Sequence, residues 1–152
     1  MTKTMPLRNL AIPLIACFAT LAFGGLFTPG EWYEALNKAP WNPPNVAFPI
    51  VWTILYLFIA ISGWQIFSSN IIQLKWCWWA QLSVNAIWSW VFFGQQWVLI
   101  GLIDIVILNV MVITLIIGCF KCKLNLSAFL LLPYLAWLLL ATTLNGYILL
   151  NN

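Results

Sequence analysis

Long apolar runs, separated by short polar stretches, are the main pattern along this chain. A helix needs roughly 20 apolar residues to cross the hydrocarbon core of a bilayer, and runs of about that length cover residues 10–27, 46–67, 76–93, 97–120 and 126–150. None of them alternates like a barrel strand, and lipid offers no partner to irregular backbone. The pattern therefore predicts an all-α integral membrane protein, a bundle of five transmembrane helices forming one domain over residues 1–152.

One connection between the runs is much longer than the others. It covers residues 28–45 and reads TPGEWYEALNKAPWNPPN. Its prolines restrict the backbone and favour a stiff, extended segment. Together with Trp32, Tyr33 and Trp41, they predict a lid over the mouth of the bundle. The alternative is an aromatic belt at the membrane interface, where Trp and Tyr are normally enriched.

The composition supports a membrane protein and excludes several other classes. Apolar residues make up 64% of the chain and charged residues 6%, against roughly 25% charged residues in a typical globular domain. Because so few charged side chains could not cover the surface of a soluble protein, lipid must be the main solvent of this chain. The net charge of +3 is spread along the chain without a basic run, and we expect no nucleic-acid partner.

The basic residues predict an orientation. With five spans, Lys3, Arg8, Lys75, Lys121 and Lys123 share one side, and Lys38 alone lies on the other. Because basic residues concentrate in cytoplasmic loops, we expect a cytoplasmic N-terminus, with the long connection and the C-terminus on the far side of the membrane.

A cleaved leader is the alternative reading of the first run. The segment LIAC at 14–17 resembles a lipoprotein cleavage site that follows basic residues. However, the apolar run continues well past Cys17. We therefore expect an uncleaved first helix.

Candidates for self-contained catalysis are few. The chain has no histidine, which removes the commonest general base and metal ligand. Cys119 and Cys122 form a lone CxxC motif, and a structural zinc site would need two further ligands; we expect packed thiols and no metal. No pair of carboxylates suited to general acid–base catalysis is visible, since Glu31 and Glu34 lie alone in the long connection. Any chemistry would therefore depend on a bound ligand.

Aromatic and small residues share faces of two predicted helices. Trp52, Tyr56 and Gly63 recur at helical spacing in the second run, and the fifth run repeats this with Tyr134, Trp137, Ala141, Leu144 and Asn145. Pro133 is expected to kink the fifth helix and open room beside it. Such faces suit a flat apolar ligand that stacks on rings, but they also occur in ordinary helix packing.

Polar residues inside the third and fourth runs are the remaining candidates. Gln81, Asn85 and Ser89 follow one face, and they either join helices by hydrogen bonds or line a pocket. Asp104 is the one acid inside a span, and intramembrane acids are candidates for function; Asn85, Asn109 and Thr114 are its expected partners. A structural role near the helix end is the alternative.

Seven segments together resemble the translocator protein family, also called TSPO, the tryptophan-rich sensory proteins or the peripheral-type benzodiazepine receptors. They occur in family order over nearly the whole chain: GEWY at 30–33, LNKAPWNPP at 36–44, VWTILY at 51–56, QLSVNAIWS at 81–89, FFG at 92–94, PYLAW at 133–137 and ATTLN at 141–145.

The resemblance implies a five-helix membrane receptor for porphyrins, such as protoporphyrin IX and haem, and for hydrophobic drug-like molecules. It places the pocket under the first loop, requires no cofactor and implies a homodimer. The residues that it leads us to expect around the ligand are Trp32, Tyr33, Trp41, Trp52, Tyr56, Asn85, Trp88, Tyr134, Trp137, Ala141 and Leu144. Trp52 and Trp137 match the tryptophans linked to porphyrin degradation, and Lys38 is a candidate partner for a propionate.

Three functions remain open at this point. The first is a porphyrin-binding sensor, the second is an enzyme-like, light-dependent degradation of protoporphyrin IX, and the third is a transporter of tetrapyrroles or other hydrophobic anions. An odd number of spans does not favour the inverted repeats of many transporters. The chain also lacks the basic residue that follows the C-terminal tyrosine in animal members, so we expect no specific cholesterol binding and a bacterial cytoplasmic membrane as the host.

Overall fold

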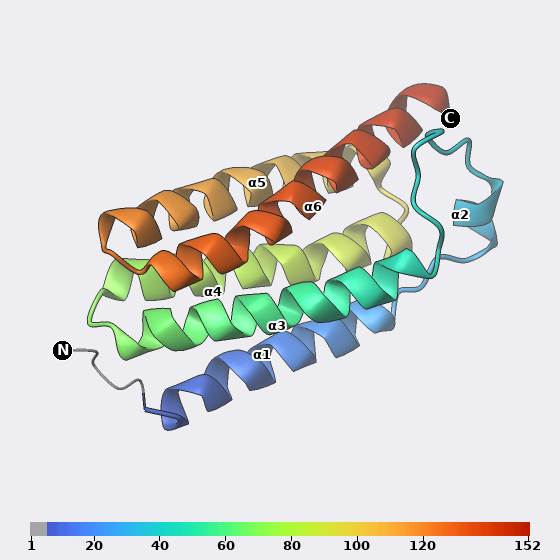
Figure 1. Cartoon of the computed structure of the whole chain (residues 1–152). Coiled ribbons are helices and arrows are strands. Elements are labelled where there is room, and N and C mark those ends of the chain that lie inside the picture. Colours follow the sequence, from blue (N-terminus) through green and yellow to red (C-terminus); the bar gives the residue numbers. More distant parts are fainter. Residues whose placement is uncertain (1–5) are drawn as a thin grey trace.

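The computed structural model describes residues 6–152, so Lys3 lies outside the described part. Five long helices run alongside one another, and a short helix lies at one end of the bundle (Figure 1). The elements are α1 (Arg8–Gly25), α2 (Glu31–Ala35), α3 (Ala47–Ser68), α4 (Ile72–Ser89), a π-helical turn η1 (Trp90–Gly94), α5 (Val98–Lys121) and α6 (Asn125–Asn151). The prediction of an all-α, five-helix membrane protein is confirmed.

Four helices, α1, α3, α5 and α6, are long and apolar enough to cross a membrane by themselves. The hydropathy of α4 is lower because it carries Gln73, Lys75, Gln81, Asn85 and four tryptophans. Helices α1, α3 and α5 pack against α4, and the side chains of Trp78 and Gln81 are 0% exposed. Trp76 and Ile87 are exposed, so the least apolar long helix buries one face and presents the other to the outside.

The connection between α3 and α4 is shorter than the predicted polar stretch at 68–75. It consists of residues 69–71, and α4 begins at Ile72. The Ser69 hydroxyl donates to the carbonyl of Ile66 (2.7 Å) and accepts from the amide of Ile71 (3.3 Å), so one side chain closes the turn. Helix α4 begins earlier than the sequence predicts because Leu74 is buried in the core. The polar residues on either side of Leu74 hide this signal in the sequence.

The two ends of the bundle differ in their connections. The α3–α4 and α5–α6 connections lie at the end where α1 begins, while the 26–46 connection, the α4–α5 connection and the C-terminus lie at the other end (Figure 1). Arg8, Lys75, Lys121 and Lys123 therefore belong to the first end, and Lys38 belongs to the second. The basic residues of the described part are therefore divided between the two ends as the order of five helices predicts.

Helices α1, α3 and α4 meet tightly around Gly63. A Cβ atom at this position would lie 2.8 Å from the Cβ of Pro13 and 2.8 Å from the Trp78 ring. The Trp78 indole N–H donates to the carbonyl of Ile59, at 3.1 Å, which fixes the ring beside the glycine. Only a residue without a side chain allows this approach.

Gly63→Ala is therefore expected to destabilise the bundle. The added methyl group must displace the proline or the indole ring, and overpacking of this kind costs about 1–3 kcal/mol. Thermal unfolding in detergent, followed by circular dichroism, should show a lower melting temperature. Gly146→Ala is the matched control, because a Cβ there meets nothing within 4 Å; equal melting of both variants would contradict the close packing.

Candidate ligand-binding site

A hydrogen-bonded triad joins α4 to α6 in the interior. The Tyr134 hydroxyl accepts from the Asn85 amide at 2.9 Å and donates to the carbonyl oxygen of Gln81 at 3.1 Å. Tyr134 and Gln81 are fully buried, and Asn85 is 4% exposed. The polar face predicted for the third run thus includes two residues that bond across helices. One donor, Nε2 of Gln81, has no partner in residues 6–152.

Aromatic rings from α3 cover this triad. The Trp52 ring lies 5.5 Å from Tyr56 and 6.3 Å from Tyr134, measured between ring centroids. Trp52 is half-buried, whereas Tyr56 and Tyr134 are buried. We call Trp52, Tyr56, Gln81, Asn85 and Tyr134 the central cluster. It brings together four of the residues expected around a ligand.

A second aromatic group closes the bundle beneath the long connection. Tyr33 of α2 is 5% exposed and lies 6.3 Å from Phe92 and 5.4 Å from Phe93. Trp32 also contacts Phe92, at 5.8 Å, and Trp88 stacks on Phe92 at 4.9 Å. We call Trp32, Tyr33, Trp88, Phe92 and Phe93 the mouth cluster. The sequence pattern alone did not single out the two phenylalanines, although the FFG motif contains them.

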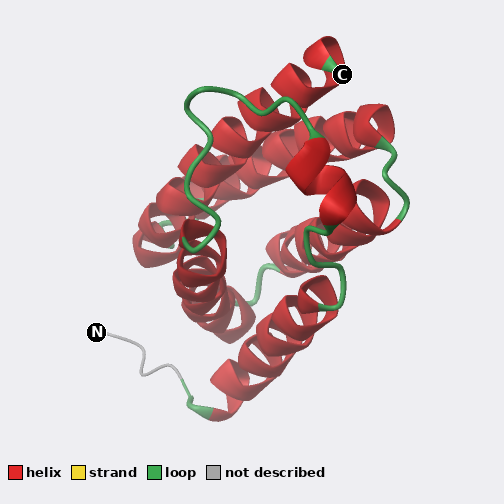
Figure 2. Ribbon diagram, turned by 90° about the vertical axis from the view of Figure 1, so that its right-hand side faces the viewer, coloured by secondary structure: helices red, strands yellow, loops and turns green. Residues whose placement is uncertain are grey.

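The π-helical turn η1 is what supplies the partners of α2. This turn follows directly after α4 and contains Phe92 and Phe93, and single π turns are frequent at functional sites. Figure 2 shows α2 and the long connection passing over the end of the bundle. The Trp88 indole N–H is buried there without a partner among the described residues.

Two straps fasten the long connection to α6. The Trp41 indole N–H donates to the Thr143 hydroxyl at 3.2 Å, and the Trp41 ring lies 5.5 Å from Tyr147. The Asn152 side chain accepts from the Asn37 amide at 2.8 Å and donates to the Asn37 carbonyl at 3.2 Å. Trp41 therefore lies on the α6 side of the mouth, apart from Trp32 and Tyr33.

Lys38 closes the end of α2. Its ammonium group donates to the carbonyls of Tyr33 (2.8 Å) and Glu34 (3.1 Å) and lies 4.8 Å from the centre of the Tyr33 ring. Burial raises the pKa of the Tyr33 phenol, and the hydrogen bond to Asn42 opposes this shift. The ammonium group has three N–H donors, so one remains for a ligand propionate beside these two carbonyls.

A groove of about 420 Å³ runs along the outside of the bundle between α3 and α6. Trp137 lines it and contacts Phe48 at 5.6 Å, so Trp52 and Trp137 have different aromatic neighbours. We call it the α3/α6 groove. Its lining residues are Val51, Ile54, Leu55, Phe58, Pro133, Ala136, Trp137 and Leu140.

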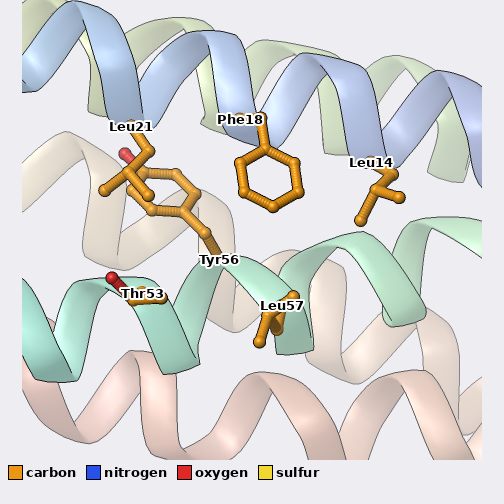
Figure 3. Close-up of a pocket in the computed structure, with 6 residues that line it drawn as sticks. All are labelled: Leu14, Phe18, Leu21, Thr53, Tyr56 and Leu57. Carbon is orange, nitrogen blue, oxygen red and sulfur yellow. The ribbon is translucent and has the colours of Figure 1, made fainter.

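A smaller recess lies between α1 and α3. Leu14, Phe18 and Leu21 face Thr53, Tyr56 and Leu57 across it (Figure 3). Its free volume is about 10 Å³, which is close to the minimum for one water molecule. This recess is a packing gap and does not hold a ligand.

Comparison with known proteins now identifies the family. The model of the TspO/MBR family matches residues 11–150. The chain belongs to the TspO/MBR family. It is 36% identical to the tryptophan-rich protein TspO of Archaeoglobus fulgidus, over 97% of this chain and 99% of that protein. It is 32% identical to protein CrtK of Rhodobacter capsulatus (93% and 91% covered) and 30% identical to the human translocator protein (88% and 81% covered).

The resemblance based on the seven segments is thus confirmed, and with it the assignment as a tryptophan-rich membrane protein of the sensor type. Two residues expected near the family pocket lie on the inner side of α6. Leu144 is 6% exposed and Ala141 packs against the main core.

The expected partners of Asp104 were wrong. Asn85 bonds to Tyr134, Thr114 bonds to the carbonyl of Val110, and Asn109 bonds to Thr142 and to the carbonyl of Ile105. One carboxylate oxygen of Asp104 is buried without a partner among the described residues. The sequence could not show this, because each of these amides and hydroxyls finds a nearer acceptor or donor once the helices pack.

Removing the bridging hydroxyl should weaken the bundle. Tyr134→Phe leaves the amide of Asn85 and the carbonyl oxygen of Gln81 without their partner in a buried site, which costs about 1–3 kcal/mol. We expect a lower free energy of unfolding in detergent denaturation. Tyr147→Phe is the control, because the Tyr147 side chain is only half-buried; a loss as large as that of Tyr134→Phe would argue against the triad as a special link.

Proposed function

We propose that this protein is a membrane receptor that binds flat hydrophobic ligands of the porphyrin class, such as protoporphyrin IX or haem, and hydrophobic drug-like molecules. The ligand lies in the bundle under the 28–45 connection, against the central cluster. The observation that carries this proposal is the combination of aromatic faces with unpartnered polar donors, Nε2 of Gln81 in the central cluster and Nε1 of Trp88 in the mouth cluster. Related chains named tryptophan-rich sensory protein and translocator protein support the same class of function.

The chemistry of the central cluster suits such a ligand. Trp52 and Tyr56 offer ring faces on which a conjugated macrocycle stacks. The unpartnered N–H groups of Gln81 and Trp88 are donors for a carbonyl or carboxylate oxygen. A buried donor without a partner is costly, so a ligand that accepts from it gains binding free energy.

The 28–45 connection serves as the lid in this proposal. The mouth cluster fills the space beneath it, so bound ligand displaces some of these aromatic contacts. Trp32, Tyr33 and Trp88 then exchange one apolar neighbour for another, which keeps the cost of displacement small. The third N–H of the Lys38 ammonium group is a donor for a ligand that carries an acid group.

We further propose the membrane arrangement. The end that holds Arg8, Lys75, Lys121 and Lys123 faces the cytoplasm, following the bias of basic residues. The host is the cytoplasmic membrane of a bacterium, and two copies associate as a homodimer.

A titration with protoporphyrin IX in the dark tests the binding proposal. Quenching of tryptophan fluorescence in purified protein should saturate. Trp52→Phe should raise Kd by about threefold to tenfold, because a lost stacking contact is worth about 0.5–1.5 kcal/mol.

Trp76→Phe is the matched control, since Trp76 is 68% exposed at the start of α4. Its Kd should equal that of the unmodified protein. Quenching that never saturates, and is the same in all variants, would mean partitioning into the detergent and would refute the receptor proposal.

A further inference from the structure

The α3/α6 groove has a local cause in the sequence. Pro133 has no N–H to bond within the helix, and such a residue loosens the preceding turn. Ala136, one turn further on, leaves the space beside α3 unfilled. Ile54, Pro133 and Ala136 are exposed on the outer surface of the bundle, where the solvent is lipid. The lining contains no charged residue.

The groove and the central cluster occupy the same stretches of α3 and α6. Leu55 lines the groove and is only 3% exposed, so it also belongs to the core. Trp137 and Val51 likewise line the groove and pack against the core. Tyr134 follows Pro133 directly and Trp52 follows Val51. The wall of the groove is therefore shared with the core around the proposed ligand.

Entry through the mouth would meet a stronger barrier. There, Tyr33 is held among Phe92, Phe93 and Lys38, and the two straps add three hydrogen bonds to α6. By contrast, the side chains of Leu55 and Trp137 make no hydrogen bond within residues 6–152. Displacing Leu55 of α3 and Trp137 of α6 breaks no side-chain hydrogen bond, whereas opening the lid breaks three.

We propose that the α3/α6 groove is a lateral entrance, through which flat hydrophobic ligands pass from the bilayer to the central cluster. This inference rests on the proposed function, which supplies the ligand class. Such ligands concentrate in the hydrocarbon phase, because water rejects their apolar surface. They therefore arrive at the groove rather than at the aqueous face of the lid.

Blocking the groove tests the entrance. Ala136→Phe places a ring in it, and the protein is studied in bilayer nanodiscs with protoporphyrin IX by stopped-flow tryptophan quenching. We expect kon and koff to fall together by about tenfold or more, with Kd unchanged, because an obstructed path changes rates without changing the bound state.

Two variants serve as comparisons. Val106→Phe places the same ring on the lipid-facing side of α5, where Val106 is 46% exposed, and should leave both rates unchanged. Thr143→Val removes the acceptor of the Trp41 strap and should also leave them unchanged if the ligand does not enter by the lid.

Three results would overturn the entrance. They are unchanged rates in Ala136→Phe, a raised Kd in that variant (which would make the groove the binding site itself), and faster entry in Thr143→Val. Failure of the receptor proposal looks different, because the unmodified protein would then show no saturable binding at all.

Discussion

Buried polar groups in a membrane bundle must find their hydrogen-bond partners inside the protein, because the surrounding hydrocarbon offers none. The Tyr134 hydroxyl meets this requirement for two amide side chains of α4 at once. It thereby fixes the rotation of α6 against α4 and sets which faces of the other helices meet. Trp52 packs on the same tyrosine, so α3 is aligned by the same link. The position of the proposed ligand site follows from this one bridge.

The same requirement explains which face of α4 is buried. Its amides Gln81 and Asn85 would be poorly solvated by lipid, and they lie on the face that packs inside the bundle. Ile72, Trp76 and Ile87 are exposed on its outer face. In the first half of α4, Trp78 is buried beside Gly63. At the end of α4, Trp88 stacks on Phe92. The helix with the lowest hydropathy therefore makes specific contacts along its buried face.

The fold was predictable because lipid imposes a simple rule on length and hydropathy. Finer features depended on contacts between distant residues, which no single run of sequence contains. Residues 72–75 read as a polar connection, yet Leu74 packs in the core and draws them into α4. The partners expected for Asp104 were wrong for the same reason.

Of the expected ligand contacts, Trp52, Tyr56, Asn85 and Tyr134 do meet, whereas Trp137 lines the outer groove. The apolar lining of that groove has no distinctive signal, since such residues occur throughout membrane helices.

Pro133 lies in α6, where some side chains face the polar triad and others line the α3/α6 groove. The residue after it, Tyr134, points into the polar triad, while Ala136 and Trp137 border the groove. A helix without the proline would keep its full hydrogen bonding at this level and pack more closely on α3. The proline therefore costs some helix stability but leaves space next to the most tightly bonded part of the core. In the proposed route, a rigid interior bridge beside a loosened outer wall would let a large ligand enter the bundle without unfolding its polar centre.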